Sequence, residues 1–454
     1  QMAKNLAYGI DFGTTNSTIA LVNEIGKIEQ MAIDRQSPNP AIMRSVVYVS
    51  PKMQYLFGAP AVEAYLVDVA QNQETKTKPI FTGRYIKVSG DSTSGGISND
   101  QFVPEIIQVS ESDNGRLFQS LKSSLSSNLL KSVNVFGEAM TLEMFVGNFL
   151  GEMKKRADEI VKQNVTKAII GRPVKYVGGN EQLAMERMEE AAKIAGFDEV
   201  VFEYEPVGAA YDYGVSVNET QICLIFDFGG GTLDISIVKF PERKILVNVG
   251  LPIGGDYFNY KVFESQLAVY FGKGSRYGMY KHEFPNSLFR ELKNWYRISL
   301  MKNEAFGKSL EHYDFMNTRP ATVKALRSLV FNNLGFGLYE EIERVKKNLT
   351  DKEEDKFLFK AELIDIDSQI SRVDLEEIIS SDLSNIDNLI NQAILEAGIE
   401  IDDIDVVATT GGSSLIPIVK NHLNQKFGKG KIKNSDTFTS VAKGLALRAK
   451  EVFG

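Results

Sequence analysis

Two glycine-rich segments of this chain are near-copies of one another and together could hold a polyphosphate. Asp11 begins the first, DFGTT at residues 11–15, and Asp227 begins the second, DFGGGT at residues 227–232. Glycines leave the backbone N–H groups of a turn open to a phosphate, and an adjacent aspartate can orient a hydrated divalent cation. One such turn alone is usually a plain hairpin, so the prediction depends on the pair.

The elements that position these segments are predicted to be strand–turn–strand hairpins. An apolar run precedes each tip, at residues 8–10 and 222–226, and apolar and polar residues alternate after it, at residues 19–22 and 233–237. Alternation with a period of two predicts strands. The glycines of a P-loop or a dinucleotide fingerprint lead into a helix instead. Two hairpins of this kind predict a duplicated fold that closes on one polyphosphate from both sides.

A third glycine site, GGSS at residues 411–414, joins an apolar strand at residues 406–410 to a helix that opens near Pro417. Its glycines would let the backbone approach a flat ring or a phosphate, and the helix N-terminus would add positive potential. Strand–glycine–helix turns are often purely structural, so this segment alone is weak support for a ligand.

Composition limits the classes of partner. A chain of 454 residues with 43% apolar content can bury two cores, so two large lobes are expected. The formal charge of −8 argues against nucleic acid or an anionic membrane as the main partner. No apolar run reaches membrane-spanning length, and the N-terminus lacks a signal-peptide core. Cys223 is the single cysteine and the three histidines stand far apart, so neither a disulfide nor a protein-built metal site is expected.

Strand-like and helical segments alternate along the chain, which predicts an α/β architecture. Helices are expected at residues 142–161 and 181–195, the second ended by Gly196, with strands at 168–171 and 200–202. Residues 89–100 are rich in Ser, Gly and Asp and predict an exposed loop. The aromatic-rich stretch from about 260 to 340 is expected to be helical and peripheral, and no chemistry is assigned to it.

Taken in order, these segments resemble the actin-like ATPase superfamily and, within it, the DnaK-type heat-shock chaperones. Supporting matches are GRP at 171–173, YEPVGAA at 204–210, GGDYF at 254–258 and ERVKKNL at 343–349. The chain is most similar to the short YegD-like subgroup, which consists of a nucleotide-binding region. It ends at Gly454, just after a helix beginning near Ser440, so no client-binding domain is expected.

The resemblance implies two lobes of duplicated RNase H-like topology, with a nucleotide cleft between them and peripheral subdomains. Lobe I would span 1–217, with its core at 1–39 and 141–217, a peripheral subdomain at about 40–140, and the C-terminal helix at about 437–454. Lobe II would span 218–436, with its core at 218–258 and 362–436 and a peripheral subdomain at about 259–361.

The same resemblance implies binding of Mg-ATP or ADP. Asp11, Glu205 and Asp227 would hold the water shell of Mg²⁺ and, with Thr232, form the catalytic set. The phosphate residues would be Gly13, Thr14, Thr15 and Asn16 from one lobe and Gly229, Gly230, Gly231 and Thr232 from the other. The ribose and adenine would lie between Glu343, Lys346, Lys347 and Thr350 on one side and Gly411, Gly412, Ser413 and Leu415 on the other. From the residues alone, the segment 343–350 is more simply an exposed charged helix face.

Two departures from the family pattern affect the expected activity. The family carries a lysine in a Gly-Asp-Ala-Ala-Lys segment near the γ-phosphate, and Val62 stands at that position here, so hydrolysis is expected to be slow or absent. Lys122, Lys76 or Lys78 could replace that lysine from another backbone position. Leu415 and Lys347 stand where the family has arginines that stack on adenine, which predicts weaker or apolar support of the base.

The sequence therefore predicts a cytoplasmic adenine-nucleotide-binding protein of the DnaK superfamily, whose lobe closure is read by an unidentified protein partner. Two alternatives stay open. A sugar or acetate kinase on the same fold would need an acceptor pocket with a general-base carboxylate, which the sequence does not locate. A filament-forming relative fits less well because of the chaperone-like segment 343–350.

Overall fold

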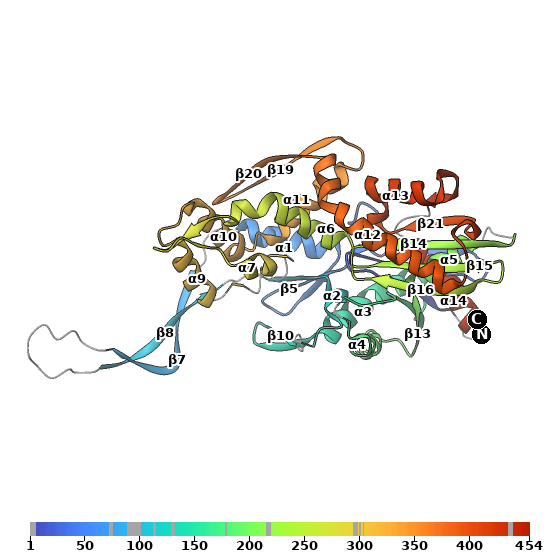
Figure 1. Ribbon diagram of the computed structural model, residues 1–454. Helices are drawn as coiled ribbons and strands as arrows, with labels where there is room; N and C mark the ends of the chain where they lie inside the picture. The colour runs from blue at the N-terminus through green and yellow to red at the C-terminus, as the bar shows by residue number, and fades with distance from the viewer. Residues whose placement is uncertain are drawn as a thin grey trace, which may run out of the picture.

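The structure is a computed structural model that describes residues 6–71, 76–88, 101–111, 115–128, 132–177, 179–214, 219–293, 298, 301–302, 304–434 and 439–454. The loop expected at residues 89–100 lies outside the described residues. The body is elongated, and a long hairpin of β7 (Lys76–Val88) and β8 (Gln101–Glu111) projects from one end (Figure 1). No helix in the described part of the chain is long and apolar enough to cross a membrane.

Two mixed sheets form the centres of two lobes and share one topology. The first sheet contains β13 (Glu199–Tyr204), β12 (Lys167–Arg172), β1 (Tyr8–Phe12), β2 (Asn16–Val22) and β3 (Ile28–Gln30) in that order, with β4 (Met43–Arg44) also on β2. The second contains β22 (Ile432–Asn434), β21 (Val406–Thr410), β14 (Gln221–Phe228), β15 (Leu233–Phe240) and β16 (Lys244–Leu251). We call the first sheet and the elements on it lobe I, and the second sheet and its elements lobe II.

The duplication is visible in the strand pairing. β1 pairs antiparallel with β2 and parallel with β12, while β14 pairs antiparallel with β15 and parallel with β21. Each predicted hairpin is therefore present, and each sits at the centre of its sheet with a parallel neighbour on its other side. The expectation of an actin-like, two-lobed α/β fold is confirmed.

Helices flank both sheets and connect them. They are α1 (Ala59–Gln71), α2 (Leu121–Ser124), α3 (Leu142–Val161), α4 (Glu181–Ile194), α5 (Glu205–Tyr213), α6 (Gly255–Val262), α7 (Asn286–Glu291), α9 (Glu304–Asp314), α10 (Pro320–Phe331), α11 (Gly335–Asn348), α12 (Arg372–Ala397), α13 (Pro417–Phe427) and α14 (Ser440–Phe453). The bounds predicted for α3 are confirmed; Thr141 caps its N-terminus through a bond from the N–H of Met144. The predicted helix at 181–195 is also confirmed, and Gly196 after it has φ +85°.

Two helices, α5 and α14, pack between the two central sheets. α14 packs on α5 and on β1, β2 and β12, while α5 also contacts β14 and β15. Glycines make this approach possible, because a Cβ on Gly9 or on Gly444 would overlap the backbone of α14 or α5 respectively. Both lobes are thus anchored to one pair of helices.

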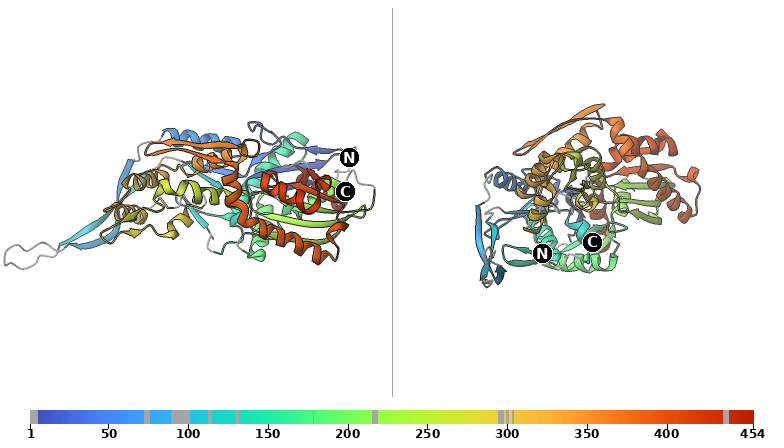
Figure 2. Two further views of the ribbon diagram at one scale, coloured as in Figure 1. Left: turned by 45° about the horizontal axis from the view of Figure 1, so that its top comes forward. Right: turned by 60° about the vertical axis from the view of Figure 1, so that its left-hand side comes forward.

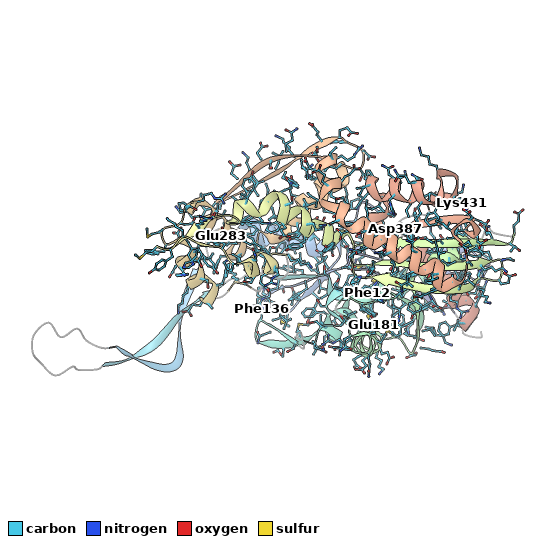
Figure 3. All side chains as sticks on the ribbon, in the orientation of Figure 1. Phe12, Phe136, Glu181, Glu283, Asp387 and Lys431 are labelled. Atoms are coloured by element: carbon cyan, nitrogen blue, oxygen red, sulfur yellow. The ribbon has the colours of Figure 1, made fainter. Side chains whose placement is uncertain are left out.

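Smaller sheets and helices form the periphery of each lobe. On lobe I these are β5 (Val46–Val49), β6 (Tyr55–Phe57) and β9 (Arg116–Gln119), with the hairpin of β10 (Ser132–Val135) and β11 (Glu138–Thr141). On lobe II they are the hairpins β17 (Arg276–Tyr277)–β18 (His282–Glu283) and β19 (Glu354–Ala361)–β20 (Ile364–Ser371), beside α7, α9, α10 and α11. The left view of Figure 2 shows the gold helices of this periphery at the end of the body from which the blue hairpin of β7 and β8 projects. Phe12 lies inside the body, whereas Glu283 and Lys431 mark its opposite ends (Figure 3).

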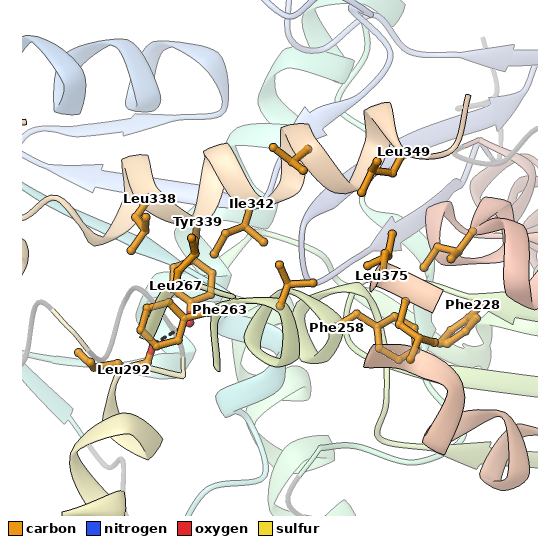
Figure 4. Packing of buried hydrophobic residues seen from close by; sticks show 14 of the residues in the cluster. Phe228, Phe258, Phe263, Leu267, Leu292, Leu338, Tyr339, Ile342, Leu349 and Leu375 are labelled. Atoms are coloured by element: carbon orange, nitrogen blue, oxygen red, sulfur yellow. Dashed lines mark hydrogen bonds between the residues drawn. The ribbon is translucent and has the colours of Figure 1, made fainter. Parts of the chain in front are cut away.

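Helix α11 is fixed by its apolar face. Tyr339 and Ile342 pack toward Phe263 and Leu267, with the Tyr339 and Phe263 ring centroids 5.9 Å apart (Figure 4). The hydroxyl of Tyr339 donates to the carbonyl of Leu292 at 2.6 Å. Because this face is buried, the polar face of α11 is held in one orientation.

Candidate functional site

The tips of the two glycine-rich hairpins meet between the lobes. A Cβ on Gly230 would lie 2.5 Å from the Oγ1 of Thr15, and a Cβ on Gly231 would lie 2.6 Å from the Oγ1 of Thr14. No side chain larger than hydrogen fits at these positions without displacing the opposite loop. The backbone of each loop is therefore exposed to the same space from opposite sides, as binding of one polyphosphate requires.

The third glycine turn supports the second loop from behind. Gly411 has φ +79°, and a Cβ there would overlap the carbonyl of Phe228. The hydroxyl of Ser413 donates to the carbonyl of Gly229 at 2.8 Å. On the other side, the N–H of Asp256 donates to the carbonyl of Gly230 at 2.9 Å. These contacts hold the loop before any ligand arrives.

A cavity of about 680 Å³ opens between the lobes at this point. Its lining includes residues from all three glycine segments and from α11. The predicted site residues that line it are Thr15, Asn16, Gly229, Gly230, Glu343, Lys346, Lys347, Thr350, Gly412, Ser413 and Leu415. The volume and the mixture of charged and apolar walls suit a ligand of nucleotide size.

The polar face of α11 forms one wall of this cavity. Lys346 is buried, pairs with Glu343 at 2.6 Å and donates to the carbonyl of Gly255 at 3.2 Å. The amide of Asn259 donates to Glu343 at 3.0 Å. Burial alone would raise the pKa of Glu343, but Lys346 and Lys347 hold it down at about 2. An exposed charged face would not bury Lys346, so this segment is more than a solvated surface.

Beneath the loops lies a cluster of four carboxylates, from Asp11, Glu205, Asp227 and Asp234. Asp227 and Asp234 stand directly opposite one another in the register of β14 and β15. Burial and the charge of Glu205 raise the pKa of Asp11 to about 7 and that of Asp234 to about 7 as well. Burial, then Glu205, Asp234 and Asp11, raise the pKa of Asp227 well above its ordinary value. The cluster carries more negative charge than its surroundings neutralise.

The cation at this cluster is Lys122. It lies in the short helix α2, is 6% exposed, and its Nζ forms an ion pair with Glu205, which begins α5. Burial would lower the pKa of Lys122, but Glu205 and Asp11 raise it above its ordinary value, so the ammonium is charged.

Of the three lysines that could replace the one missing at position 62, the structure places Lys122 at the carboxylate cluster. Val62 is half-buried in α1, where it packs against an apolar cluster that contains residues of both lobes, and it does not line the cavity. Lys122 supplies the cation from a position that is not adjacent in sequence to either loop. The side chains of Lys76 and Lys78, the other candidates, lie outside what the structure describes.

The carboxylate cluster fits a hydrated Mg²⁺ rather than a directly ligated one. Within the described residues, no three acidic, His or Cys side chains converge as direct metal ligands. After burial, the charge of Glu205 is the next largest cause of the raised pKa of both Asp11 and Asp227, and Lys122 offsets part of this effect. Mg²⁺ keeps several of its waters when bound, so outer-sphere carboxylates suit it.

Several residues of the cavity were not predicted from the sequence. From lobe I these are Ser37, Pro38, Asn39, Ile42, Arg44, Gln119 and Ser120; from lobe II they are Asp256, Asn259, Tyr339, Glu340 and Asp351. Asp256 belongs to the segment GGDYF, which supported the resemblance without being given a role. Burial, only partly offset by Lys346, raises its pKa to about 6.

Comparison with known proteins agrees with this geometry. The Hsp70 protein family matches residues 107–287 and 335–454. A chaperone protein HscA homolog of Rickettsia prowazekii (strain Madrid E) is 24% identical over 457 residues, which cover 100% of this chain and 58% of the relative. The HscA homolog of Rickettsia typhi (strain ATCC VR-144 / Wilmington) is 24% identical over 456 residues, with the same shares covered. The chain thus spans 58% of the length of these curated relatives.

Proposed function

Since the chain belongs to the Hsp70 family, we propose that it binds an adenine nucleotide with Mg²⁺ in the cavity between its lobes and hydrolyses ATP there. The observation that carries the proposal is the convergence of three separate glycine segments on one cavity above a buried carboxylate cluster. A plain structural role would not require the two hairpin tips to face each other with glycines at the points of closest approach.

The walls of the cavity suggest how the nucleotide lies. The N–H groups around Gly13–Asn16 and Gly229–Thr232 would hold the β- and γ-phosphates from the two lobes. Glu343 and Lys346 would bind the ribose, because both are fixed on the polar face of α11 that lines the cavity. The adenine would lie between Lys347 and Thr350 on one side and Leu415 and Ile416 on the other.

The carboxylate cluster and Lys122 supply the chemistry of the proposal. Mg²⁺, held through its waters, would neutralise charge on the phosphates. Asp234, whose pKa is raised to about 7, could accept a proton from an attacking water. Lys122 would stabilise negative charge that develops on the transferred phosphate. The side chain of Thr232, at the end of the loop, hydrogen-bonds Asp234 of β15. Slow or absent hydrolysis stays a prediction, and the position of Lys122 beside Glu205 supports the alternative that ATP is hydrolysed.

Closure of the lobes on the nucleotide, recognition by a protein partner and a cytoplasmic location belong to the same proposal. The single cysteine of the chain is buried and free, which suits a reducing compartment. The YegD-like assignment stays a prediction, since the comparisons support the family and not a subgroup.

Thermal unfolding with and without Mg-ADP tests the proposal. A ligand at about a hundredfold over its dissociation constant stabilises the folded state by about 2.7 kcal/mol, so Tm is expected to rise by several degrees. No rise with any adenine nucleotide at millimolar concentration would contradict nucleotide binding. Coupled turnover assays with a panel of sugars and acids, and light scattering with ATP, would detect a small-molecule kinase or a filament instead.

A further inference from the structure

Arg44 is fixed directly beside the first glycine-rich loop. It ends β4, and its register partner is Asn16, the first residue of β2 after the loop. The next residue, Ser45, holds the loop twice. Its N–H donates to the carbonyl of Thr15 at 2.9 Å, and its hydroxyl donates to the carbonyl of Gly13 at 2.7 Å. The backbone of Arg44 therefore cannot move independently of the loop.

The side chain of Arg44 reaches across the cavity to lobe II. Its Nη1 donates to Glu340 at 2.7 Å and its Nη2 donates to the other oxygen of the same carboxylate at 2.6 Å. The guanidinium also lies 5.5 Å from the ring centroid of Phe336. Glu340 is its one hydrogen-bond partner within the described part of the chain and takes two of its five donors. Three N–H groups remain for another acceptor.

The charges of the cavity give this arginine a distinct role. The basic residues among its described lining are Arg44, Lys346 and Lys347, and Arg44 alone comes from lobe I. Both lysines already pair with Glu343, at 2.6 and 3.5 Å. The lining also contains four carboxyl residues, which are Asp256, Glu340, Glu343 and Asp351. A polyphosphate that enters this space needs a cation near the first loop, and Arg44 provides it.

We infer that Arg44 binds the phosphate of the nucleotide nearest the ribose, from the lobe I side of the cavity. The inference rests on the proposed function and adds a phosphate-binding residue to it. Asn16 of the phosphate loop lies on one side of Arg44, and α11, whose following turn carries Glu343, lies on the other. The fork of a guanidinium fits the oxygens of a phosphate as it fits those of a carboxylate. In the free protein, Glu340 holds the guanidinium at the wall where that phosphate arrives.

Titration calorimetry with Mg-ADP, AMP and adenosine tests the inference, using the full chain and the variants Arg44→Ala, Arg44→Lys and Glu340→Gln. Arg344→Ala is the matched control, because Arg344 lies on the same helix as Glu340 but pairs with Glu341 and Asp355 within lobe II. Unfolding of each ligand-free variant shows whether it is folded. Arg44→Ala is expected to weaken the binding of ADP and AMP about 10- to 100-fold and the binding of adenosine less than about threefold. Arg44→Lys should fall between, and Glu340→Gln should weaken the binding of ADP and AMP less than Arg44→Ala does and leave adenosine binding unchanged. Arg344→Ala should bind ADP like the wild type.

Two results would overturn the inference while leaving the proposed function in place. In the first, Arg44→Ala and Glu340→Gln weaken the binding of ADP, AMP and adenosine to the same extent. This would mean that the ion pair of Arg44 and Glu340 only joins the lobes. In the second, Arg44→Ala binds ADP and AMP like the wild type. If the wild-type protein binds none of the three ligands, the proposed function itself fails and the inference falls with it.

Discussion

Lys122 and Glu205 form an ion pair in which both side chains are less than a tenth exposed. They are 83 residues apart in sequence, one in α2 on the periphery of lobe I and the other at the start of α5 under the sheets. The pair places one fixed cation against a cluster of carboxylates that burial and mutual repulsion hold at raised pKa. We interpret it as the electrostatic centre of an ATP-hydrolysing site.

Replacing Lys122 should lower the rate of ATP hydrolysis without weakening nucleotide binding. Lys122→Met is expected to lower single-turnover ATP hydrolysis by about 10²- to 10³-fold, because one preorganised charge is lost. Binding of Mg-ADP should be retained, since the loops and α11 stay in place. Lys154→Met is the matched control, because Lys154 is also buried and paired, with Asp158, away from the cavity. Equal loss of turnover in both variants would mean that instability, and not chemistry, is responsible.

Placing a lysine at position 62, where the family has one, should not raise ATP turnover. Val62 is half-buried against an apolar cluster with residues of both lobes, so Val62→Lys should lower the free energy of unfolding by about 1–3 kcal/mol through partial burial of a charge. ATP turnover measured below the unfolding transition should not rise. A clear rise in turnover would show that residue 62 reaches the phosphates and that Lys122 does not replace it.

Stability without Mg²⁺ should fall as pH rises through neutrality. The carboxyls of Asp11 and Asp234 have pKa values of about 7 in the folded protein against an ordinary 3.8, so the folded state binds protons more tightly than the unfolded state. Their contribution is complete below about pH 4 and is lost as pH rises through about 7. Glu343, with its pKa lowered to about 2, gives no pH dependence in this range.

The measurement is Tm from pH 5 to pH 8, in EDTA and in Mg²⁺. Tm in EDTA should fall over this range, and the rise in Tm caused by Mg²⁺ should grow, because the ion favours ionised carboxylates. Asp234→Asn should reduce the slope, whereas Asp367→Asn, exposed on β20 beside Lys356, should leave it unchanged. If the Tm of the wild type in EDTA does not change between pH 5 and pH 8, the raised pKa values of the carboxylate cluster are contradicted.

The glycine positions make a steric prediction. Gly230→Ala should weaken nucleotide binding, because its Cβ would press on the Oγ1 of Thr15 at 2.5 Å in the opposite lobe. Gly411→Ala should instead destabilise the fold, since φ is +79° and the Cβ would overlap the backbone of Phe228. Gly430→Ala is the control, with nothing near its Cβ and no left-handed φ. Unfolding curves and ADP titrations of the three variants distinguish these effects.

Local sequence patterns predicted much of the framework. The period-two runs gave both central hairpins, the helix at Leu142–Val161 has the expected bounds, and the strand Val406–Thr410 is confirmed. These elements depend on residues that are neighbours in sequence, where periodicity and capping act directly. The same holds for the glycine turns, whose conformational requirement is local.

Residues brought together only by the tertiary fold could not be predicted in this way. Lys122 meets Glu205 across 83 positions, and Arg44 meets Glu340 across 296 positions. Lys122 was one of three lysines that could replace the cation missing at Val62, but no local pattern could choose among them, and nothing in the sequence marked Arg44.

Calorimetric titration with ATP, ADP and GTP, each with and without Mg²⁺, tests the central claim most directly. The account predicts one site per chain, binding of ATP and ADP that is tighter with Mg²⁺, weaker binding of GTP, and loss of the Mg²⁺-dependent part in Asp11→Asn and Asp227→Asn. Absence of binding for every nucleotide, or Mg²⁺-dependent binding that both aspartate variants retain in full, would contradict it.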